Sequence, residues 1–534
     1  MLAGAKSGYG NSRPDVHDYR GTGAARALTG RLRLAALIVV LLSVALLYRQ
    51  TPTHFFYFDD FDFLSLPPPA SIQDWVAPLN PFQSNILGWY RPIPTFYYFV
   101  ILRALFGLDP ALFMVTTLLT LLVNVLLVFL VVERVTKQSV IALMAAHFYG
   151  VNYIHFETLS WAAGFQEQSL ALFALTTLAT YLVWTQREPY NSHRSWVRLA
   201  SVLAYLLALA SKETAIILPA WLTLHFAAVH LGRMRWLVFF KKVIAAQWPY
   251  YAVSLVYLIL RYSAITSRAG GSDTYAFQAG GTPLFRYIMF VRWIIDEFRL
   301  EDLFQAAKMI VAPNAHLGRL GLPALGLVVA LCVVVAAAAP VCPALRRRLG
   351  SIGRGDFRAV LLGLSWFVVG LMPVALTTGQ AAYYLVLPAV GAYLAMACVV
   401  GGILGTIMKR SAPVAVIVGL VLWAGTAWGA FDRVAALEDS DMPMLGRVAK
   451  QAIWALRDRY SSLPPDASVF LLDFPQKVWR GESAERSIQL YYGRQVRVVV
   501  GSSAEVMLPS RDPNVSVIKY ADGKVLLSDG TVGR

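Results

Sequence analysis

Two adjacent aspartates, Asp59 and Asp60, follow the first long apolar run of the chain, in the segment Tyr57-Phe58-Asp59-Asp60-Phe61-Asp62-Phe63. A carboxylate can act as a general base, and aromatic neighbours that exclude water raise its pKa towards the useful range. Aspartates also cap helices or lie in solvated loops, which is the structural alternative. In an extended backbone Asp59 and Asp60 point to opposite faces, while Asp60 and Asp62 share one. We therefore expect only one of the adjacent pair to face a reacting group.

Two charged pairs occur further along the chain. His155 and Glu157 could bind a metal ion, hydrogen-bond a sugar or cap a helical hairpin. Lys212 and Glu213 lie in a short turn, Ser211-Lys212-Glu213-Thr214, between two apolar runs. A charge near the depth of a bilayer is costly unless it is paired or used. This turn therefore predicts either an internal salt bridge or an ammonium that meets a phosphate, with Glu213 as its acidic neighbour.

Arginines and tyrosines complete the set of candidate residues. Arg91 lies in Trp89-Tyr90-Arg91-Pro92 of the first long loop. Arg261 follows an apolar run, where its side chain could reach lipid headgroups. Tyr383 and Tyr384 could bind substrate or belong to the aromatic belt at a membrane boundary.

The composition places these residues in a membrane protein. Of the 534 residues, 57% are hydrophobic and 15% are charged, whereas about a quarter of the residues of a soluble protein are charged. Apolar runs near the length that crosses a bilayer recur along the chain. We expect an all-α polytopic protein with about eleven transmembrane helices, at about 33–48, 111–132, 138–152, 166–184, 199–211, 214–231, 245–263, 323–343, 358–376, 383–407 and 412–430.

The distribution of Lys and Arg predicts the orientation of these helices. If the N-terminus is cytoplasmic, the inner segments contain clusters such as Arg346-Arg347-Arg348 and Lys409-Arg410, and the longer outer loops contain fewer cations. The chain is then multi-pass, with its N-terminus inside and its C-terminus outside. Its Ala- and Arg-rich composition suits a bacterial inner membrane. Every candidate residue above falls on the outer side, so a single outward-facing site is the simplest explanation.

The predicted organisation has three parts: a cytoplasmic tail at 1–32, a transmembrane domain at 33–432 and a small extracytoplasmic domain at 433–534. Two long outer loops, 49–110 and 264–322, contain stretches that fit interfacial helices. After residue 440, strand-like runs at 468–474, 495–500 and 515–527 predict a small α/β fold.

The net charge of +16 is explained by this topology and by contact with anionic lipid. We expect no nucleic-acid partner, because no basic stripe with interleaved aromatic residues is present. Cys332, Cys342 and Cys398 all fall in expected spans and fit apolar packing. We assign no cofactor, although Asp59, Asp60, His155 and Glu157 could hold a divalent cation if they converge.

The order of these motifs resembles the polytopic glycosyltransferases of the GT-C class. It is most similar to the transmembrane O-mannosyltransferases that carry tetratricopeptide repeats and to their bacterial relatives. The segments that carry the resemblance are Phe58-Asp59-Asp60, Tyr90-Arg91-Pro92, His155 to Gly164, Ser211-Lys212-Glu213-Thr214, Arg261, Trp366 to Pro373 and Tyr383 to Pro388. Two features depart from the family: the tail has no such repeats, and Gln380-Ala381-Ala382 stands where an arginine often precedes the tyrosines.

The resemblance implies transfer of a sugar from a polyprenyl-phosphate donor to a hydroxyl acceptor on the extracytoplasmic face. The acceptor could be a glycan, a lipid or a protein, and direct displacement would invert the anomeric centre. Asp59 or Asp60 would take the proton of the hydroxyl, and Arg91, Lys212 or Arg261 would stabilise the leaving phosphate. His155, Glu157, Glu213, Tyr383 and Tyr384 would contact the substrates.

Two other functions remain open from the sequence. A lipid-linked sugar flippase or transporter usually places ionisable residues at the midplane of the membrane, on broken helices in paired repeats. The charges here fall at helix ends, and no paired repeat is visible. A polymerase or ligase of envelope polysaccharide would use the same carrier lipid and is harder to separate from a simple transferase.

Overall fold

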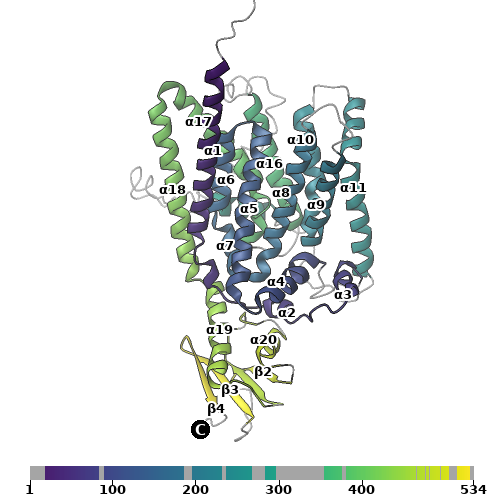
Figure 1. Ribbon diagram of the computed structural model, residues 1–534, viewed down its shortest axis with the longest axis vertical. Helices are drawn as coiled ribbons and strands as arrows, with labels where there is room; N and C mark the ends of the chain where they lie inside the picture. The colour runs from purple at the N-terminus through teal and green to yellow at the C-terminus, as the bar shows by residue number, and fades with distance from the viewer. Residues whose placement is uncertain are drawn as a thin grey trace, which may run out of the picture.

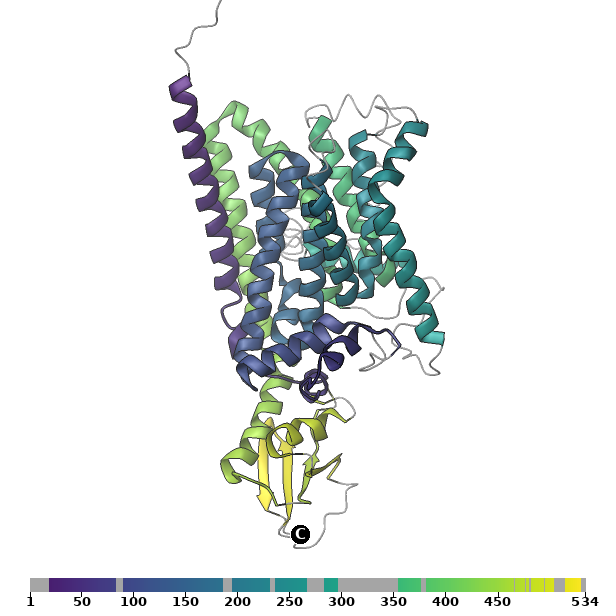
Figure 2. The same cartoon turned by 45° about the vertical axis from the view of Figure 1, so that its right-hand side comes forward.

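The computed structural model describes residues 19–82, 90–185, 195–230, 236–266, 283–295, 354–375, 381–464, 466–475, 477–479, 482–493, 495–503 and 514–529. These residues form a bundle of long helices with a smaller α/β unit below it, as Figures 1 and 2 show. The first described helix begins at the upper end of the bundle, and the last described residues lie in the lower unit. We call the two ends of the bundle the upper and lower ends, as in Figure 1.

Long helices run along the length of the bundle (Figure 1). Their bounds are α1 Tyr19–Leu47, α5 Pro110–Thr136, α6 Ser139–Val151, α8 Phe165–Thr185, α9 Ser195–Ser211, α10 Leu218–His230, α11 Trp236–Thr266, α12 Pro283–Ile295, α16 Arg354–Ala375, α17 Ala389–Arg410 and α18 Ala412–Glu438. Their ends follow local rules. Helix α5 begins with Pro110 after the capping side chain of Asp109, which accepts a hydrogen bond from the amide of Ala111 at 3.0 Å.

Seven helical stretches of the described chain are long and apolar enough to cross a membrane. They are Gly30–Thr53, Pro110–Thr136, Ala162–Thr185, Trp236–Arg261, Phe357–Ala375, Ala389–Arg410 and Ala412–Glu438. Ser139–Val151 and Ser195–Ser211 are shorter apolar helices at two further expected spans. The protein is therefore a mostly helical integral membrane protein. The expected span at 323–343 lies outside the described residues, as do Cys332 and Cys342, whereas Cys398 is buried in α17 as predicted.

Short elements cover the lower end of the bundle. The loop after α1 forms α2 Asp60–Leu64, α3 Ile72–Val76, a π-helical turn at Ile93–Tyr97 and α4 Tyr98–Phe106. Further short helices are η5 Tyr153–His155, α7 Phe156–Ser160, η6 Ala162–Gly164, η8 Glu213–Ile217 and η12 Ala382–Leu385. Most of the candidate residues lie in or beside these short elements. Most of the second expected loop, 264–322, lies outside the described residues.

The C-terminal α/β unit consists of α19 Asp441–Arg459, α20 Ser483–Tyr492 and the strands β1 Ser468–Leu472, β2 Arg497–Gly501, β3 Val515–Ala521 and β4 Lys524–Asp529. The strand order is β2-β1-β3-β4. Strand β1 pairs in parallel with β2 and β3, and β3 pairs with β4 in antiparallel fashion. The single strand expected at 515–527 is in fact a hairpin. Asp522 and Gly523 both have positive φ and form its turn.

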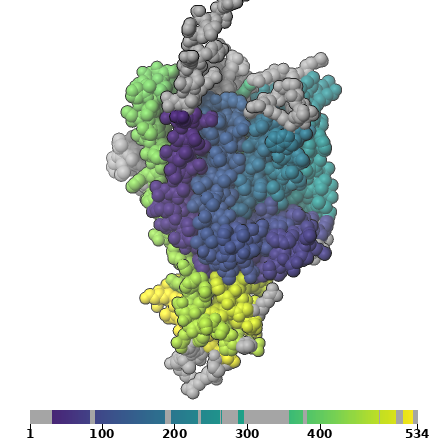
Figure 3. Space-filling model, in the orientation of Figure 1, coloured from purple at the N-terminus to yellow at the C-terminus, as the bar shows by residue number. Residues whose placement is uncertain are grey.

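One apolar cluster joins this unit to the first loop. Its buried members include Phe56 and Phe61 of the loop, Phe113 of α5, Ile453 of α19 and Trp479 after β1. Figure 3 shows the unit in contact with the lower end of the bundle. Helix α19 approaches the loop so closely that a Cβ at Gly446 would lie 2.9 Å from the carbonyl oxygen of Phe55. The C-terminal unit therefore packs on the segment that carries the aspartates.

Candidate functional site

Asp59 and Asp60 lie at the start of a helix, and the expectation of an extended backbone was wrong. Asp60 is the first residue of α2, and Asp59 occupies the N-cap position without making a capping hydrogen bond. Successive side chains of a helix are separated by about 100°, so Asp60 and Asp62 do not share a face as they would in a strand. Both aspartates of the pair are buried, with 2% exposure for Asp59 and none for Asp60.

Asp60 fastens the first loop to the bundle. One carboxyl oxygen accepts a hydrogen bond from the amide of Ala163 at 2.7 Å, and the other accepts one from the amide of Tyr57 at 3.2 Å. Burial raises the pKa of Asp60 well above its ordinary value, and the nearby charge of Asp59 adds to this shift. The carboxyl group of Asp60 is thus committed to backbone contacts, which is a structural role.

The residue before the pair has an unusual backbone. Phe58 has a φ of 57°, which a bulky side chain rarely adopts. Its amide donates to the carbonyl of Val478 at 2.9 Å, and it forms a parallel bridge with Trp479. Contact with the C-terminal unit therefore holds the turn that presents Asp59.

Four charged residues form two ion pairs at the lower end. Arg91 donates to both carboxylate oxygens of Glu213, at 2.9 Å and 2.5 Å, and to Gln166 at 2.5 Å. Lys212 pairs with Glu167, and the side chains of this pair are 1% and 3% exposed. Lys212 therefore forms the predicted internal salt bridge, but its carboxylate partner is Glu167 and not the adjacent Glu213.

This arrangement changes what Arg91 and Lys212 can do. Burial alone would raise the pKa of Glu213, but Arg91 outweighs burial and lowers that pKa to about 2. The positive charge of Arg91 is thus balanced by a carboxylate, as is that of Lys212. Both cations connect the first loop and η8 to the start of α8. This is a positioning role, in addition to the phosphate contact expected from the sequence.

Tyr383 and Tyr384 lie next to Lys212. The ammonium nitrogen of Lys212 is 4.6 Å from the ring centre of Tyr384 and 5.6 Å from that of Tyr383. The ring of Tyr383 is 6.3 Å from that of Trp161, which is 6.4 Å from that of Tyr57. Tyr57, Trp161 and Tyr383 form an aromatic wall beside Asp59 and Glu157.

His155 is held inside the protein. It is fully buried; its Nε2 lies 2.9 Å from the carbonyl oxygen of Tyr149, and its Nδ1 lies 3.2 Å from the side-chain nitrogen Nε2 of Gln168. Burial lowers the pKa of His155 to about 4, so the ring is neutral. With Nε2 donating and Nδ1 accepting, both ring nitrogens are used within the fold. His155 thus supports the turn before Glu157 and does not contact substrate in this arrangement.

Glu157 differs from His155, because it is only partly buried. Burial and the negative charge of Glu167 raise the pKa of Glu157 to about 7, while Lys477 acts in the opposite direction. Its charge also acts on the hydroxyl of Tyr57, as do those of Asp60 and Asp59. Glu157 can therefore take up or release a proton near neutral pH at the surface of the site.

Arg261 lies near the lower end of α11 and is partly exposed. Among the residues that the structure describes, no carboxylate pairs with it. The hydroxyl of Tyr257, one turn earlier, lies within electrostatic reach of Arg261, Glu213 and Arg91. Of the three expected phosphate contacts, Arg261 is the one whose charge is not balanced within the described chain.

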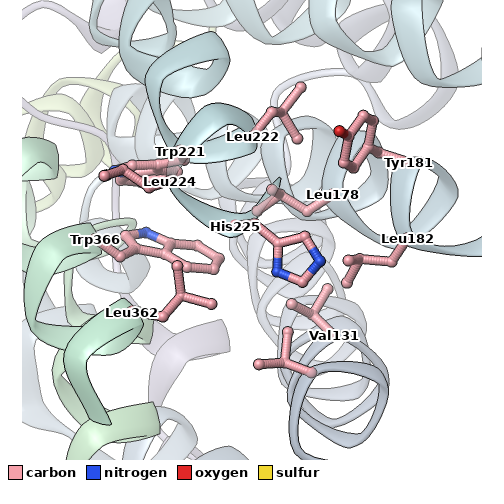
Figure 4. Close-up of a pocket in the computed structure, with 11 residues that line it drawn as sticks. Val131, Leu178, Tyr181, Leu182, Trp221, Leu222, Leu224, His225, Leu362 and Trp366 are labelled. Atoms are coloured by element: carbon pink, nitrogen blue, oxygen red, sulfur yellow. The ribbon is translucent and has the colours of Figure 1, made fainter. Parts of the chain in front are cut away.

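Two small pockets lie between the helices. One, of about 10 Å³, is lined by Glu167, Thr214, Tyr384 and Pro388, among other residues, and adjoins the site. The other, of about 20 Å³, lies away from these charges and surrounds His225, Trp221 and Trp366, as Figure 4 shows. Each has room for about one water molecule and not for a sugar. We therefore place the candidate site at the lower end of the bundle, where the partly exposed Glu157, Trp161 and Tyr383 lie around the buried Asp59 and Tyr57.

No group of three or more possible metal ligands occurs among the described residues. The divalent-cation site that the sequence left open, formed by Asp59, Asp60, His155 and Glu157, is therefore not present in the described chain. The role of Asp60 in backbone contacts and that of His155 in internal hydrogen bonds explain why.

Sequence reasoning did not single out Glu167, Tyr57 or Lys477. Glu167 could have been found from its type and position, because a carboxylate near the start of an apolar span requires a partner. Tyr57 and Lys477 carry no comparable signal, since their importance comes only from contacts between distant segments.

No protein-family model and no curated protein sequence matches the chain. Among solved structures, the fold resembles ArnT from Cupriavidus metallidurans bound to undecaprenyl phosphate, with a TM-score of 0.46, 12% identity and coverage of 94% of this chain and 97% of that chain. It also resembles AglB, an oligosaccharyltransferase from Archaeoglobus fulgidus, in complex with an inhibitory peptide and a dolichol-phosphate. That match has a TM-score of 0.42, 11% identity and coverage of 92% and 69% of the two chains. These likenesses concern the course of the chain, and no residue role is taken from them.

Proposed function

We propose that this protein is a membrane glycosyltransferase of the GT-C class. It transfers a sugar from a polyprenyl-phosphate donor to a hydroxyl acceptor, with inversion, on the extracytoplasmic side of a bacterial inner membrane. In this orientation the lower end of the bundle is the outer face. The sequence resemblance supplies the reaction class. The observation that carries the proposal is the meeting of Asp59, Glu157 and the aromatic wall at one end of an apolar bundle.

The position of the site suits a lipid-linked donor. The carrier chain of such a donor lies in the bilayer, and its phosphate lies at the surface, level with the helix ends. Aromatic rings such as Trp161 and Tyr383 offer flat apolar faces to the carbon–hydrogen faces of a sugar. The indole nitrogen of Trp161 is buried and has no hydrogen-bond acceptor among the described residues, so a sugar hydroxyl can accept its hydrogen.

The reaction is a displacement at the anomeric carbon. The acceptor oxygen forms the new bond to that carbon, the bond from the carbon to the phosphate oxygen breaks, and the phosphate leaves with the electron pair. Asp59 takes the proton of the acceptor hydroxyl, and Glu157 in its ionised form orients a hydroxyl group. Arg261 stabilises the negative charge that develops on the phosphate, while Arg91 and Lys212 hold the surrounding elements.

Asp59 is preferred to Asp60 as the base for a geometric reason. Both oxygens of Asp60 accept hydrogen bonds from backbone amides, so its carboxyl group is already used to hold the first loop. The two aspartates therefore have separable roles, and the two amide variants should behave differently.

The test is sugar transfer in proteoliposomes. The donor is labelled undecaprenyl-phosphate mannose, and membranes from cells that lack the protein supply the acceptor. We expect Asp59→Asn to slow transfer by about 10²- to 10⁴-fold, the usual contribution of a general base, with an unchanged melting temperature. Asp60→Asn should instead lower the melting temperature, and the exposed Asp439→Asn serves as the charge-matched control. Wild-type transfer by Asp59→Asn would rule out Asp59 as the base. Movement of intact donor across the bilayer without bond cleavage would point to a flippase.

A further inference from the structure

We propose that Lys477 of the C-terminal α/β unit binds the phosphate of the lipid-linked donor, so that this unit forms one wall of the site. The inference rests on the proposed function, because it names a binding residue for the same donor. It assigns to the C-terminal unit a part in donor binding that the sequence did not suggest.

The first step is the position of Lys477 relative to Asp59. Lys477 immediately precedes Val478, whose carbonyl accepts the hydrogen bond from the amide of Phe58 at 2.9 Å. Phe58 in turn immediately precedes Asp59. The hydrogen bond between Phe58 and Val478 therefore joins the two backbone segments. Lys477 is next to this bond on one segment, and Asp59 is next to it on the other.

The second step is the rigidity of the segment that carries Lys477. Val478 is fully buried and Trp479 is 7% exposed. The ring of Trp479 is 4.9 Å from that of Phe474, which is 5.8 Å from that of Tyr520 on β3. The backbone at 477–479 is therefore fixed to the sheet, while the side chain of Lys477 is exposed. A fixed backbone with an exposed ammonium suits the binding of an anion.

The third step is the balance of charges around the site. The chemistry needs positive charge where the phosphate leaves, yet Glu213 and Glu167 already neutralise Arg91 and Lys212. Arg486, another cation of the C-terminal unit, pairs with Asp62 and Glu482. Within the described chain, Lys477 forms no ion pair and neither does Arg261. Of the five cations named here, which all lie among the described residues, these two are the ones without a carboxylate partner.

The fourth step is the neighbour that Lys477 faces. Its charge acts on Glu157, which lies on α7 at the lower end of the bundle. The charge of Lys477, on the C-terminal unit, therefore acts on a carboxylate of the bundle.

The experiment measures binding of undecaprenyl phosphate to purified protein in nanodiscs, by native mass spectrometry. Undecaprenol tests the contribution of the phosphate, and phosphatidic acid tests whether any lipid phosphate suffices. The variants are Lys477→Gln, Lys477→Arg and, as the matched control, Lys524→Gln. Lys524 is an exposed lysine of β4 in the same unit.

We expect Lys477→Gln to weaken undecaprenyl-phosphate binding by about tenfold, the size of one charge-assisted hydrogen bond. Lys477→Arg should retain most of the affinity, and Lys524→Gln all of it. Binding of undecaprenol and phosphatidic acid should be the same in every variant. Unchanged affinity of Lys477→Gln for undecaprenyl phosphate would overturn the proposal, as would an equal loss for undecaprenol.

The outcome also separates this inference from the proposed function. If the wild-type protein transfers sugar and Lys477→Gln binds undecaprenyl phosphate normally, only the role of Lys477 fails. If the wild-type protein binds undecaprenyl phosphate no better than undecaprenol, the donor class fails and the role of Lys477 fails with it.

Discussion

At the scale of a single residue, the raised pKa of Glu157 should be visible in the pH dependence of the transfer rate. Its pKa of about 7 results from burial and from the negative charge of Glu167, with an opposing effect of Lys477. Its negative charge acts on the hydroxyl of Tyr57 in the first loop, which donates a hydrogen bond to the sulfur of Met442 at 3.3 Å. Because the proposed role requires the ionised carboxylate, the active fraction falls as the pH drops through 7.

We therefore expect the transfer rate to decline below about pH 7, with Glu157 as the titrating group. Glutamine cannot ionise, so the transfer rate of Glu157→Gln should not change between pH 6 and 8. That rate should be roughly a tenth of the wild-type rate or less. Lys477→Gln should move the decline to higher pH, because it removes the charge that lowers the pKa of Glu157. The measurement is a pH–rate profile at saturating donor. A wild-type decline that persists in Glu157→Gln would assign it to another group.

At the scale of elements, the crossing of α16 and α17 fixes the position of the tyrosines. A Cβ at Gly391 would lie 2.5 Å from the carbonyl oxygen of Gly363, and a Cβ at Gly363 would lie 2.5 Å from that of Gly391. Small residues allow such close approach of two membrane helices. Helix α17 follows η12, so this crossing also sets where Tyr383 and Tyr384 lie over Lys212.

Gly391→Ala should therefore destabilise the bundle. The added methyl group meets backbone, which cannot move aside easily, and overpacking of this kind usually costs about 1–3 kcal/mol. The control is Gly405→Ala on the same helix, because a Cβ there meets nothing within 4 Å. Melting temperatures in detergent should fall by several degrees for Gly391→Ala and stay unchanged for Gly405→Ala. Equal melting temperatures of the two variants would show that the close crossing is not important for stability.

The long helices were predictable because each one has its own signal in an apolar run. The partners of the charged residues were not, because they depend on contacts across the chain. Lys212 pairs with Glu167, 45 positions away, and not with the adjacent Glu213. Asp60 is held by Ala163, 103 positions away. The segment Tyr57 to Phe63 has no clear helical periodicity, so the start of α2 could not be inferred from it. The β3–β4 turn was predictable from Asp522-Gly523, a common hairpin signal.

At the scale of the whole molecule, the C-terminal unit and the bundle are joined at the site itself. The bridge from Phe58 to Trp479 and the apolar cluster around Phe56 and Ile453 connect them. Arg486 of α20 adds an ion pair with Asp62 of α2, at 3.0 Å, in which the side chain of Asp62 is 4% exposed. The geometry around Asp59 therefore depends on the docking of a unit formed by residues about 400 positions later in the chain.

Reversal of the Asp62–Arg486 pair tests this dependence. Arg486→Asp places two carboxylates together and Asp62→Arg places two guanidinium groups together, so each single variant should loosen the unit and slow transfer by at least tenfold. The double variant restores opposite charges and should recover a large part of the activity, because residues in direct contact usually show coupling energies of about 0.5–3 kcal/mol. Limited proteolysis of the C-terminal unit provides a second measurement, since a loosened unit is cut faster. Additive effects of the two substitutions on both measurements would mean that this pair does not hold the unit against the site. The docking would then rest on the apolar cluster and the Phe58 bridge.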